Sequence, residues 1–354
     1  MGGLGRGWDH GERFRPASEV EIRYGHGLVR TESQTWPRYL AVTGKTAWSH
    51  VTRYVAKQPE GVGVVRLLDW GHLEAVTKSL PDNADMVIGF GGGTALDASK
   101  YVALRKDLPL RLVPTAVSTG AIIHGVFAKW KGHSIIGPVQ EWPYCDFEHV
   151  LVDYDLVLEA PWYLNTAGIG DILCMYSGVA EWRLNAKLGQ APPVDETAAR
   201  DSISYYESVV DSFPKTLKSD GSLTPHSVGF IMKAVQDRDD RQLRSPHAPG
   251  AGHSMTGPIE EAAQRGLVHG EMAALGAVIV CWAAGEPELL IDWLEGCRVR
   301  FRPADIGLER AELQRALDLA PDFMRSRGMN TVLAREPISG ARFDDLWAFL
   351  DRAG

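Results

Sequence analysis

One carboxylate and two imidazoles stand out in the second half of this 354-residue chain because small residues surround them. Asp171 ends the run Gly-Ile-Gly-Asp, His253 ends the run Gly-Ala-Gly-His, and His269 begins the run His-Gly-Glu. A carboxylate and two imidazoles from three segments suit a divalent metal with one open coordination position. Such a metal polarises a carbonyl group or lowers the pKa of a hydroxyl group.

The same three residues also fit a purely structural interpretation. No two of them form a local pair at metal-binding spacing. Asp171 would then be a helix N-cap, and the histidines would be packing residues. We predict that Asp171 lies early in its helix and that His269 begins an apolar helix.

A glycine turn in residues 85–100 is the second feature with chemical meaning. Residues 86–90 form an apolar run of strand length, the glycine triplet 91–93 follows, and Thr94 is placed to cap the next helix. Free N–H groups at a helix start hold anions, and the expected anion here is a pyrophosphate. The alternative is a tight strand–helix turn with no ligand, because the spacing is not that of the G-x-G-x-x-G fingerprint.

Strand-like and helix-like segments alternate around this turn. The strand candidates are residues 38–43, 61–68, 86–90, 110–115 and 149–153, and residues 20–30 resemble an edge strand or hairpin arm. This alternation predicts a parallel α/β sheet with right-handed crossovers. Ligands of such sheets lie beyond the carboxyl ends of the strands, where the glycine triplet and residues 114–118 both fall. That agreement favours the nucleotide interpretation of the turn.

From Pro161 onward the pattern is helical. The longest predicted helices are 163–188, 196–213, 225–237 and 271–284, and residues 245–250 form a loop. We therefore predict an α/β domain over residues 1–160 that carries a cofactor and an all-α domain over residues 161–354 that packs on it, with the active site in the cleft between them.

Composition narrows the class of protein. The net charge of −8 makes general nucleic-acid binding a poor fit. The four cysteines are widely spaced and lack a C-x-x-C pair, which indicates neither a disulfide framework nor a zinc ribbon. The N-terminus lacks a signal-peptide core, and no apolar run is long enough to span a bilayer. We expect a cytoplasmic protein with a small-molecule substrate, no membrane partner and no nucleic-acid partner.

Several pieces, in order along the chain, resemble the glycerol-1-phosphate dehydrogenase family. They are Gly-Gly-Gly-Thr-Ala-Leu-Asp-Ala-Ser-Lys at 91–100, Pro-Thr-Ala-Val-Ser at 114–118, Ala-Gly-Ile-Gly-Asp-Ile-Leu at 167–173, Ala-Glu-Trp at 180–182 and His-Gly-Glu at 269–271. That family belongs with glycerol dehydrogenase, iron-containing alcohol dehydrogenases and dehydroquinate synthase. The resemblance covers residues 85–285, is one of pattern only over 20–84, and fades after 285.

The resemblance implies site residues, a metal and a cofactor. Asp171, His253 and His269 match the three metal ligands, with zinc usual in the family and iron the alternative. The pyrophosphate of NAD or NADP would contact the segment Gly91, Gly92, Gly93, Thr94, Ala95, Leu96 and Asp97. The cofactor would also be lined by Thr115, Ala116, Val117 and Ser118. Relatives are commonly homo-oligomers.

Other positions depart from the family pattern. The aspartate that touches the substrate in relatives is Gly120 here, and the second histidine, four residues after the first metal histidine, is Gly257. We expect these glycines to widen the pocket for a larger substrate, with His124, Lys129 or Trp130 as new contacts. His124 is also the candidate proton relay. The acid that marks many NAD-specific relatives is replaced by Gly44, which leaves NADP open.

We therefore predict a metal-dependent NAD(P)(H) oxidoreductase that interconverts an alcohol and a carbonyl. One alternative is a sugar-phosphate cyclase like dehydroquinate synthase, which regenerates its NAD in each cycle. Asp171 and Gly257 count against it. The other alternative is a nucleotide-binding protein that has lost catalysis, which Gly120 and Gly257 favour and the retained ligand positions oppose.

Overall fold

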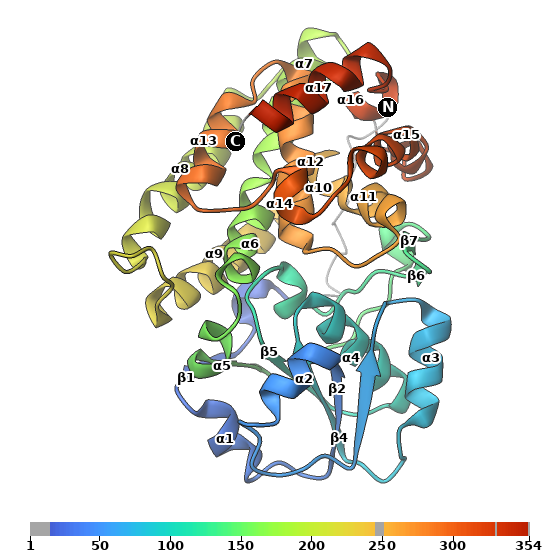
Figure 1. Ribbon diagram of the computed structural model, residues 1–354, viewed down its shortest axis with the longest axis vertical. Coiled ribbons are helices and arrows are strands. Elements are labelled where there is room, and N and C mark those ends of the chain that lie inside the picture. Colours follow the sequence, from blue (N-terminus) through green and yellow to red (C-terminus); the bar gives the residue numbers. More distant parts are fainter. Residues whose placement is uncertain (1–14, 245–250, 330, 353–354) are drawn as a thin grey trace. The chain divides into compact units, whose positions relative to one another are not determined.

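The computed structural model describes residues 15–244, 251–329 and 331–352 (Figure 1). These residues form two compact units. The first consists of residues 15–165 together with 218–240, and the second of residues 166–217 with the described residues from 241 onward. The sequence pattern did not indicate that residues 218–240 pack with the α/β unit.

The first unit is built on a six-stranded sheet in which every pairing is parallel. The strand order is β1-β8-β5-β4-β2-β3. The strands are β1 (Ile22–Gly25), β2 (Tyr39–Gly44), β3 (Gly61–Val65), β4 (Met86–Gly91), β5 (Leu110–Pro114) and β8 (Val150–Asp153). Gly91 pairs in register with Pro114, so the glycine turn and the segment after β5 leave the same edge of the sheet. The predicted parallel α/β sheet is confirmed.

Helices cover both faces of this sheet, as expected for parallel strands with apolar residues on each side. Alternation along β4 sends Ile88 to a core shared with α1 (Leu28–Ser33), α2 (Lys45–Val51) and α5 (Tyr154–Leu158). Gly89 faces the opposite side, where α4 (Gly93–Lys106) packs so closely that a Cβ at this position would lie 2.2 Å from the Ser99 hydroxyl. Helix α3 (Trp70–Ser79) covers the same side of β3.

One local prediction differs from the structure, and one segment forms strands that the sequence analysis did not predict. Residues 20–30 are not a single extended arm, because the chain turns at Gly27, whose φ is +61°, and continues as α1. Residues 129–147, which carry no clear pattern, contain a short antiparallel hairpin of β6 (Trp130–Lys131) and β7 (Ser134–Ile135). Gly132 supplies the left-handed turn residue of this hairpin.

The second unit is helical, as predicted. It contains α6 (Trp162–Leu173) from residue 166 on, α7 (Tyr176–Lys187), α8 (Glu196–Ser212), α10 (Ala251–Ser254), α11 (Thr256–Ala263), α12 (His269–Ala284), α13 (Glu288–Gly296), α14 (Pro303–Ile306), α15 (Arg310–Ser326), α16 (Val332–Arg335) and α17 (Ala341–Arg352). The single helix predicted for residues 163–188 is two helices, α6 and α7. The predicted loop 245–250 lies outside the described residues. Helix α9 (Pro225–Arg244) belongs to the α/β unit as far as residue 240.

In the described part of the chain, the helices are too short or too polar to cross a bilayer.

Candidate metal centre and cofactor turn

Asp171, His253 and His269 converge on one point in the helical unit. The Nε2 atoms of the two histidines are 3.1 Å apart, and they lie 3.5 Å and 3.4 Å from Oδ1 of Asp171. Zinc ligands at 2.0–2.2 Å in tetrahedral geometry are separated by roughly 3.3–3.6 Å. The three distances are close to those between ligand atoms of a single metal ion. These atoms therefore form a candidate metal site.

The charge of Asp171 and the facing nitrogens of the two histidines also favour a bound cation. The Asp171 side chain is 1% exposed, and a carboxylate buried to this degree is costly unless a positive charge compensates it. The two facing Nε2 atoms cannot both carry protons at 3.1 Å, because two N–H donors would then point at each other. A divalent metal among the three atoms satisfies both conditions. His269 is 35% exposed, which leaves one side of the site open to a substrate.

Glycines next to the ligands explain how three helices come this close. A Cβ on Gly170 would lie 2.6 Å from the carbonyl oxygen of Gly270, so α6 touches the start of α12 by backbone alone. A Cβ on Gly252 would lie 2.5 Å from Cα of Ala277, and one on Gly276 would lie 2.2 Å from the Gly252 carbonyl oxygen. Each ligand thus follows or precedes a glycine at which two helix backbones meet. The small residues noted in the sequence are the positioning device.

The position of Asp171 corrects the sequence-based prediction. It lies near the end of α6, which begins at Trp162, and not early in the helix. An N-cap role is therefore wrong, and its carboxylate faces the two histidines. His269 does begin the apolar helix α12, as predicted.

Next to His269, Glu271 is buried and forms an ion pair with Arg300, Nε to Oε1 at 2.9 Å. Burial raises the pKa of Glu271 to about 7, against the opposing effect of Arg300. Both residues lie in the same unit as the ligands. The pair fixes the first turn of α12, because a buried carboxylate and a guanidinium hold each other in place.

The glycine turn has the geometry that close ligand approach requires. Gly91 has a φ of +145°, which side-chain-bearing residues rarely adopt, and a Cβ on Gly92 would meet no atom within 4 Å. Helix α4 begins at Gly93 with Gly92 as its N-cap and without a side-chain cap. The prediction that Thr94 caps this helix is wrong, because the helix has already begun before it. The first amides of α4 have no partner within the helix, as at any helix start, and can meet an anion.

The segment 115–118 is tied directly to this turn. The Thr115 amide donates to the Gly91 carbonyl oxygen at 3.0 Å. The Val117 amide donates at 2.9 Å to the side chain of Asn165, which is fully buried and also donates to the Val157 carbonyl oxygen. The predicted lining segment Thr115–Ser118 therefore has a fixed backbone beside the predicted pyrophosphate turn. No sequence signal marked Asn165, whose partner Val117 is 48 residues away along the chain.

Asp97 has a supporting role in the structure. Its carboxylate accepts a hydrogen bond at 2.7 Å from the ammonium of Lys100, which is completely buried and also donates to the Ala121 carbonyl oxygen at 2.7 Å. Helix α4 is thus fastened to the loop after β5. The cofactor-binding role predicted for Asp97 stays a prediction, because this contact positions the turn without requiring a ligand.

His124 lies in the same loop. Its Nδ1 is 3.0 Å from the Val126 carbonyl oxygen, which requires the proton on Nδ1 and leaves Nε2 as an acceptor. Burial, together with the nearby charge of Lys100, lowers the pKa of His124 to about 4. The imidazole is neutral at pH 7 and a weak base. Its proposed role is therefore a hydrogen-bond acceptor more than a proton relay.

The expectation that Gly120 and Gly257 widen the pocket is wrong. A Cβ on Gly120 would lie 2.5 Å from Nη2 of Arg238 and 3.0 Å from Oδ2 of Asp239. A Cβ on Gly257 would lie 2.5 Å from the ring of Phe323. Side chains from distant segments fill both spaces, and this could not be predicted without tertiary contacts.

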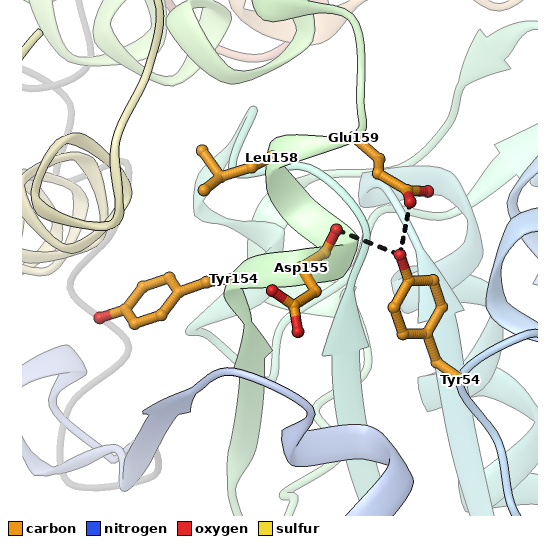
Figure 2. Close-up of a pocket in the computed structure, with 5 residues that line it drawn as sticks. All are labelled: Tyr54, Tyr154, Asp155, Leu158 and Glu159. Atoms are coloured by element: carbon orange, nitrogen blue, oxygen red, sulfur yellow. Dashed lines mark hydrogen bonds between the residues drawn. The ribbon is translucent and has the colours of Figure 1, made fainter. Parts of the chain in front are cut away.

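A shallow pocket of about 500 Å³ lies at another place in the α/β unit, and Figure 2 shows its lining. Tyr54 donates to Glu159 at 2.6 Å, and Glu159 also pairs with Arg53 at 2.6 Å. Asp155 pairs with His26 and accepts from the Gly27 amide. These contacts join the segment after α2, helix α5 and the start of α1. The polar groups of the pocket therefore hold these elements together.

Comparison with known proteins finds similar dehydrogenases. Residues 21–161 match the family model described as iron-containing alcohol dehydrogenase. The glycerol-1-phosphate dehydrogenase [NAD(P)+] of Pyrobaculum neutrophilum is 26% identical over 307 residues, which are 80% of this chain and 79% of that protein. The enzyme of the same name from Thermoplasma volcanium is 25% identical over 319 residues, 85% of each chain.

The fold has relatives among solved structures. A probable glycerol dehydrogenase from Sinorhizobium meliloti 1021 superimposes with a TM-score of 0.67 at 19% identity, over 94% of this chain and 98% of that one. The sheet and the helical unit thus share the fold of this glycerol dehydrogenase. The α/β unit is similar to the iron-containing alcohol dehydrogenases, and the chain as a whole is similar to glycerol-1-phosphate dehydrogenase.

Proposed function

We infer that this protein is a metal-dependent NAD(P)(H) oxidoreductase that interconverts an alcohol and a carbonyl compound. The observation that carries this conclusion is the convergence of Asp171, His253 and His269 with ligand-like separations. The curated relatives named glycerol-1-phosphate dehydrogenase [NAD(P)+] support the same reaction class and the same cofactor. They also favour net oxidation or reduction over the sugar-phosphate cyclase alternative.

Asp171, His253 and His269 would hold the metal, with zinc as the first choice and iron as the alternative. A bound divalent ion supplies Lewis-acid stabilisation of negative charge on a substrate oxygen. The open side next to His269 is where a substrate oxygen would approach the ligand set. Because three glycine contacts fix the helices, the ligand atoms need little reorganisation when a cation binds.

The α/β unit would hold the nucleotide. Gly91 and Gly92 let the pyrophosphate approach the backbone, and the amides at the start of α4 would bind its oxygens. The segment Thr115–Ser118, fixed by Asn165, would line the nicotinamide half of the cofactor. His124 would offer its Nε2 lone pair to a substrate hydroxyl group.

The proposed reaction needs only the substrate and the nicotinamide cofactor as reactants. In the oxidative direction the carbinol C–H bond breaks, its hydride passes to NAD(P)+, and the hydroxyl proton leaves to solvent. The products are the carbonyl compound, NAD(P)H and one proton. In the reductive direction NAD(P)H is consumed in proportion to the alcohol formed. This stoichiometry separates an oxidoreductase from a cyclase, which shows no net change in nicotinamide.

The test is NAD(P)H oxidation by the zinc-loaded protein with a panel of aldehydes and hydroxyketones. His253→Ala should abolish turnover and leave nucleotide binding within twofold of the wild type, because the two sets of residues are separate. Lys233→Ala, an exposed substitution on α9, is the matched control. Unchanged turnover in His253→Ala would show that the metal assignment is wrong.

We further propose a cytoplasmic homo-oligomer that acts on a small molecule and has no nucleic-acid or membrane partner. Four free, buried cysteines suit a reducing compartment. Light scattering on the purified protein tests the oligomeric state, and a monodisperse monomer would contradict it.

A further inference from the structure

A three-residue segment after α13, residues 298–300, contacts both the helix that carries the carboxylate ligand and the helix that carries the second histidine ligand. At one end, the Arg298 carbonyl oxygen accepts a hydrogen bond at 3.1 Å from the hydroxyl group of Thr166 on α6. At the other end, Nε and Nη2 of Arg300 lie 2.9 Å and 3.4 Å from the carboxylate oxygens of Glu271 on α12. We call residues 298–300 the strap, and all of these contacts lie within one compact unit.

The middle residue of the strap packs where α6 and α12 meet. Cγ1 of Val299 lies 2.8 Å, and the carbonyl oxygen of Gly270 lies 2.6 Å, from the position that a Cβ on Gly170 would take. Gly170 directly precedes Asp171, and Gly270 directly follows His269. The strap therefore covers the glycine contact next to two ligands, whose Oδ1 and Nε2 atoms are 3.4 Å apart.

The backbone of the strap is fixed by the end of α13. The Arg298 amide donates to the Glu295 carbonyl oxygen at 2.9 Å, and the Val299 amide donates to the Leu294 carbonyl oxygen at 2.8 Å. Arg298 has a φ of +57°, a left-handed conformation that glycine usually adopts after a helix. A residue with a side chain keeps such a conformation only where the surrounding structure determines it, and such residues gather at functional sites.

We propose that the strap holds α6 and α12 at the separation that the metal ligands require, with Arg300 as the positioning residue at its α12 end. The Glu271 side chain is 2% exposed, and a carboxylate buried to this degree needs the positive charge of Arg300. This ion pair keeps the first turn of α12, which contains His269, against the strap. The strap residues act through the ligands and do not touch the metal. The proposal rests on the proposed function, because the metal centre is part of that function.

A double-mutant cycle on zinc affinity tests this proposal. Thr166→Val removes the hydroxyl donor at the α6 end and keeps the shape of the side chain. Arg300→Met together with Glu271→Met cuts the α12 end without leaving an unpaired buried charge. Arg302→Met is the matched control, because its ion pair with Glu295 joins the chain to α13 and not to a ligand-bearing helix. Zinc affinity of each folded protein is measured by competition with a chromogenic chelator, without substrate or nucleotide.

Cutting either end should weaken zinc binding by about tenfold, the size of effect expected for groups that orient metal ligands. A strap that is cut at one end no longer joins the two helices. Cutting both ends should therefore cost little more than the larger single loss, whereas two independent contacts would multiply to about a hundredfold. The zinc affinity of Arg302→Met should equal that of the wild type.

Losses that multiply would overturn the proposal, as would wild-type zinc affinity after either end is cut, or an equal loss in Arg302→Met. A wild type that binds no zinc would contradict the metal centre of the proposed function and the strap with it, whereas the other outcomes leave that function intact. If the protein with both methionines does not fold, Val299→Ala takes its place in the cycle, because it removes the contact at Gly170 and leaves the ion pair. The same loss, again without multiplication, is then required.

Discussion

The substitution Gly252→Ala tests whether backbone contact between helices builds the metal centre. An added Cβ would lie 2.5 Å from Cα of Ala277 and from Oγ of Ser177, and 2.8 Å from the Ala277 nitrogen. Ordinary contact begins at 3.4 Å, so α10 must retreat from α12 by about 0.9 Å, because backbone atoms of a buried helix cannot step aside. His253, the next residue, must move with it.

That displacement is large compared with what a metal site tolerates. Metal–ligand distances in functional sites hold to within about 0.2 Å. Gly252→Ala should therefore weaken zinc binding by 10-fold or more, and overpacking should lower the free energy of unfolding by about 1–3 kcal/mol.

The assay is competition for zinc against a chromogenic chelator, with urea unfolding measured in parallel. Gly296→Ala is the matched control, since it lies in a helix of the same unit and its Cβ would meet no atom within 4 Å. Wild-type zinc affinity in Gly252→Ala would refute the reasoning, and so would an equal loss in Gly296→Ala.

Three further predictions follow from other parts of the chain. The pKa of His124 is about 4 in the fold and 6.5 when unfolded, because burial, Lys100 and Arg238 disfavour the imidazolium more than Asp97 favours it. The contribution of the neutral His124 to the free energy of unfolding is complete above pH 6.5 and is lost as the pH falls to 4, by up to about 3 kcal/mol. The free energy of unfolding of His124→Gln, measured in urea, should therefore depend less on pH over that range. Identical pH profiles of the two proteins would contradict this prediction. Gly44→Asp should weaken NADPH binding at least tenfold more than NADH binding in fluorescence titrations, because a carboxylate at the end of β2 repels the 2′-phosphate, and equal effects would contradict it. The four buried cysteines should react with a thiol reagent at pH 8 only after unfolding, since burial raises the thiol pKa of Cys145 to about 11 and of Cys297 to about 12, and rapid reaction of the native protein would contradict it.

Local signals account for what the sequence could predict. The β4 strand, its glycine turn and α4 are continuous in the chain, so apolar patterning and glycine were enough to identify them. The parallel sheet followed from the alternation of strands and helices. His269 was placed correctly because it directly precedes an unbroken apolar run that became α12.

The remaining features depend on distant contacts. Asp171 was assigned to the wrong end of its helix because the predicted helix 163–188 is two helices, and the first of them, α6, already ends at Leu173. Arg238 occupies the space beside Gly120, and Phe323 occupies the space beside Gly257. Both contacts join segments that are far apart in the sequence. The sequence shows that a glycine has no side chain, but only the tertiary structure shows which atoms occupy the space beside it.

If Asp171, His253 and His269 hold a divalent metal, the metal content of the purified protein must depend on His253. Wild-type protein and His253→Ala are stripped with chelator, reloaded with zinc or iron, dialysed and measured by elemental analysis. We expect close to one metal ion per chain in the wild type and almost none in His253→Ala. Equal metal content in the two proteins, or none in either, would contradict it.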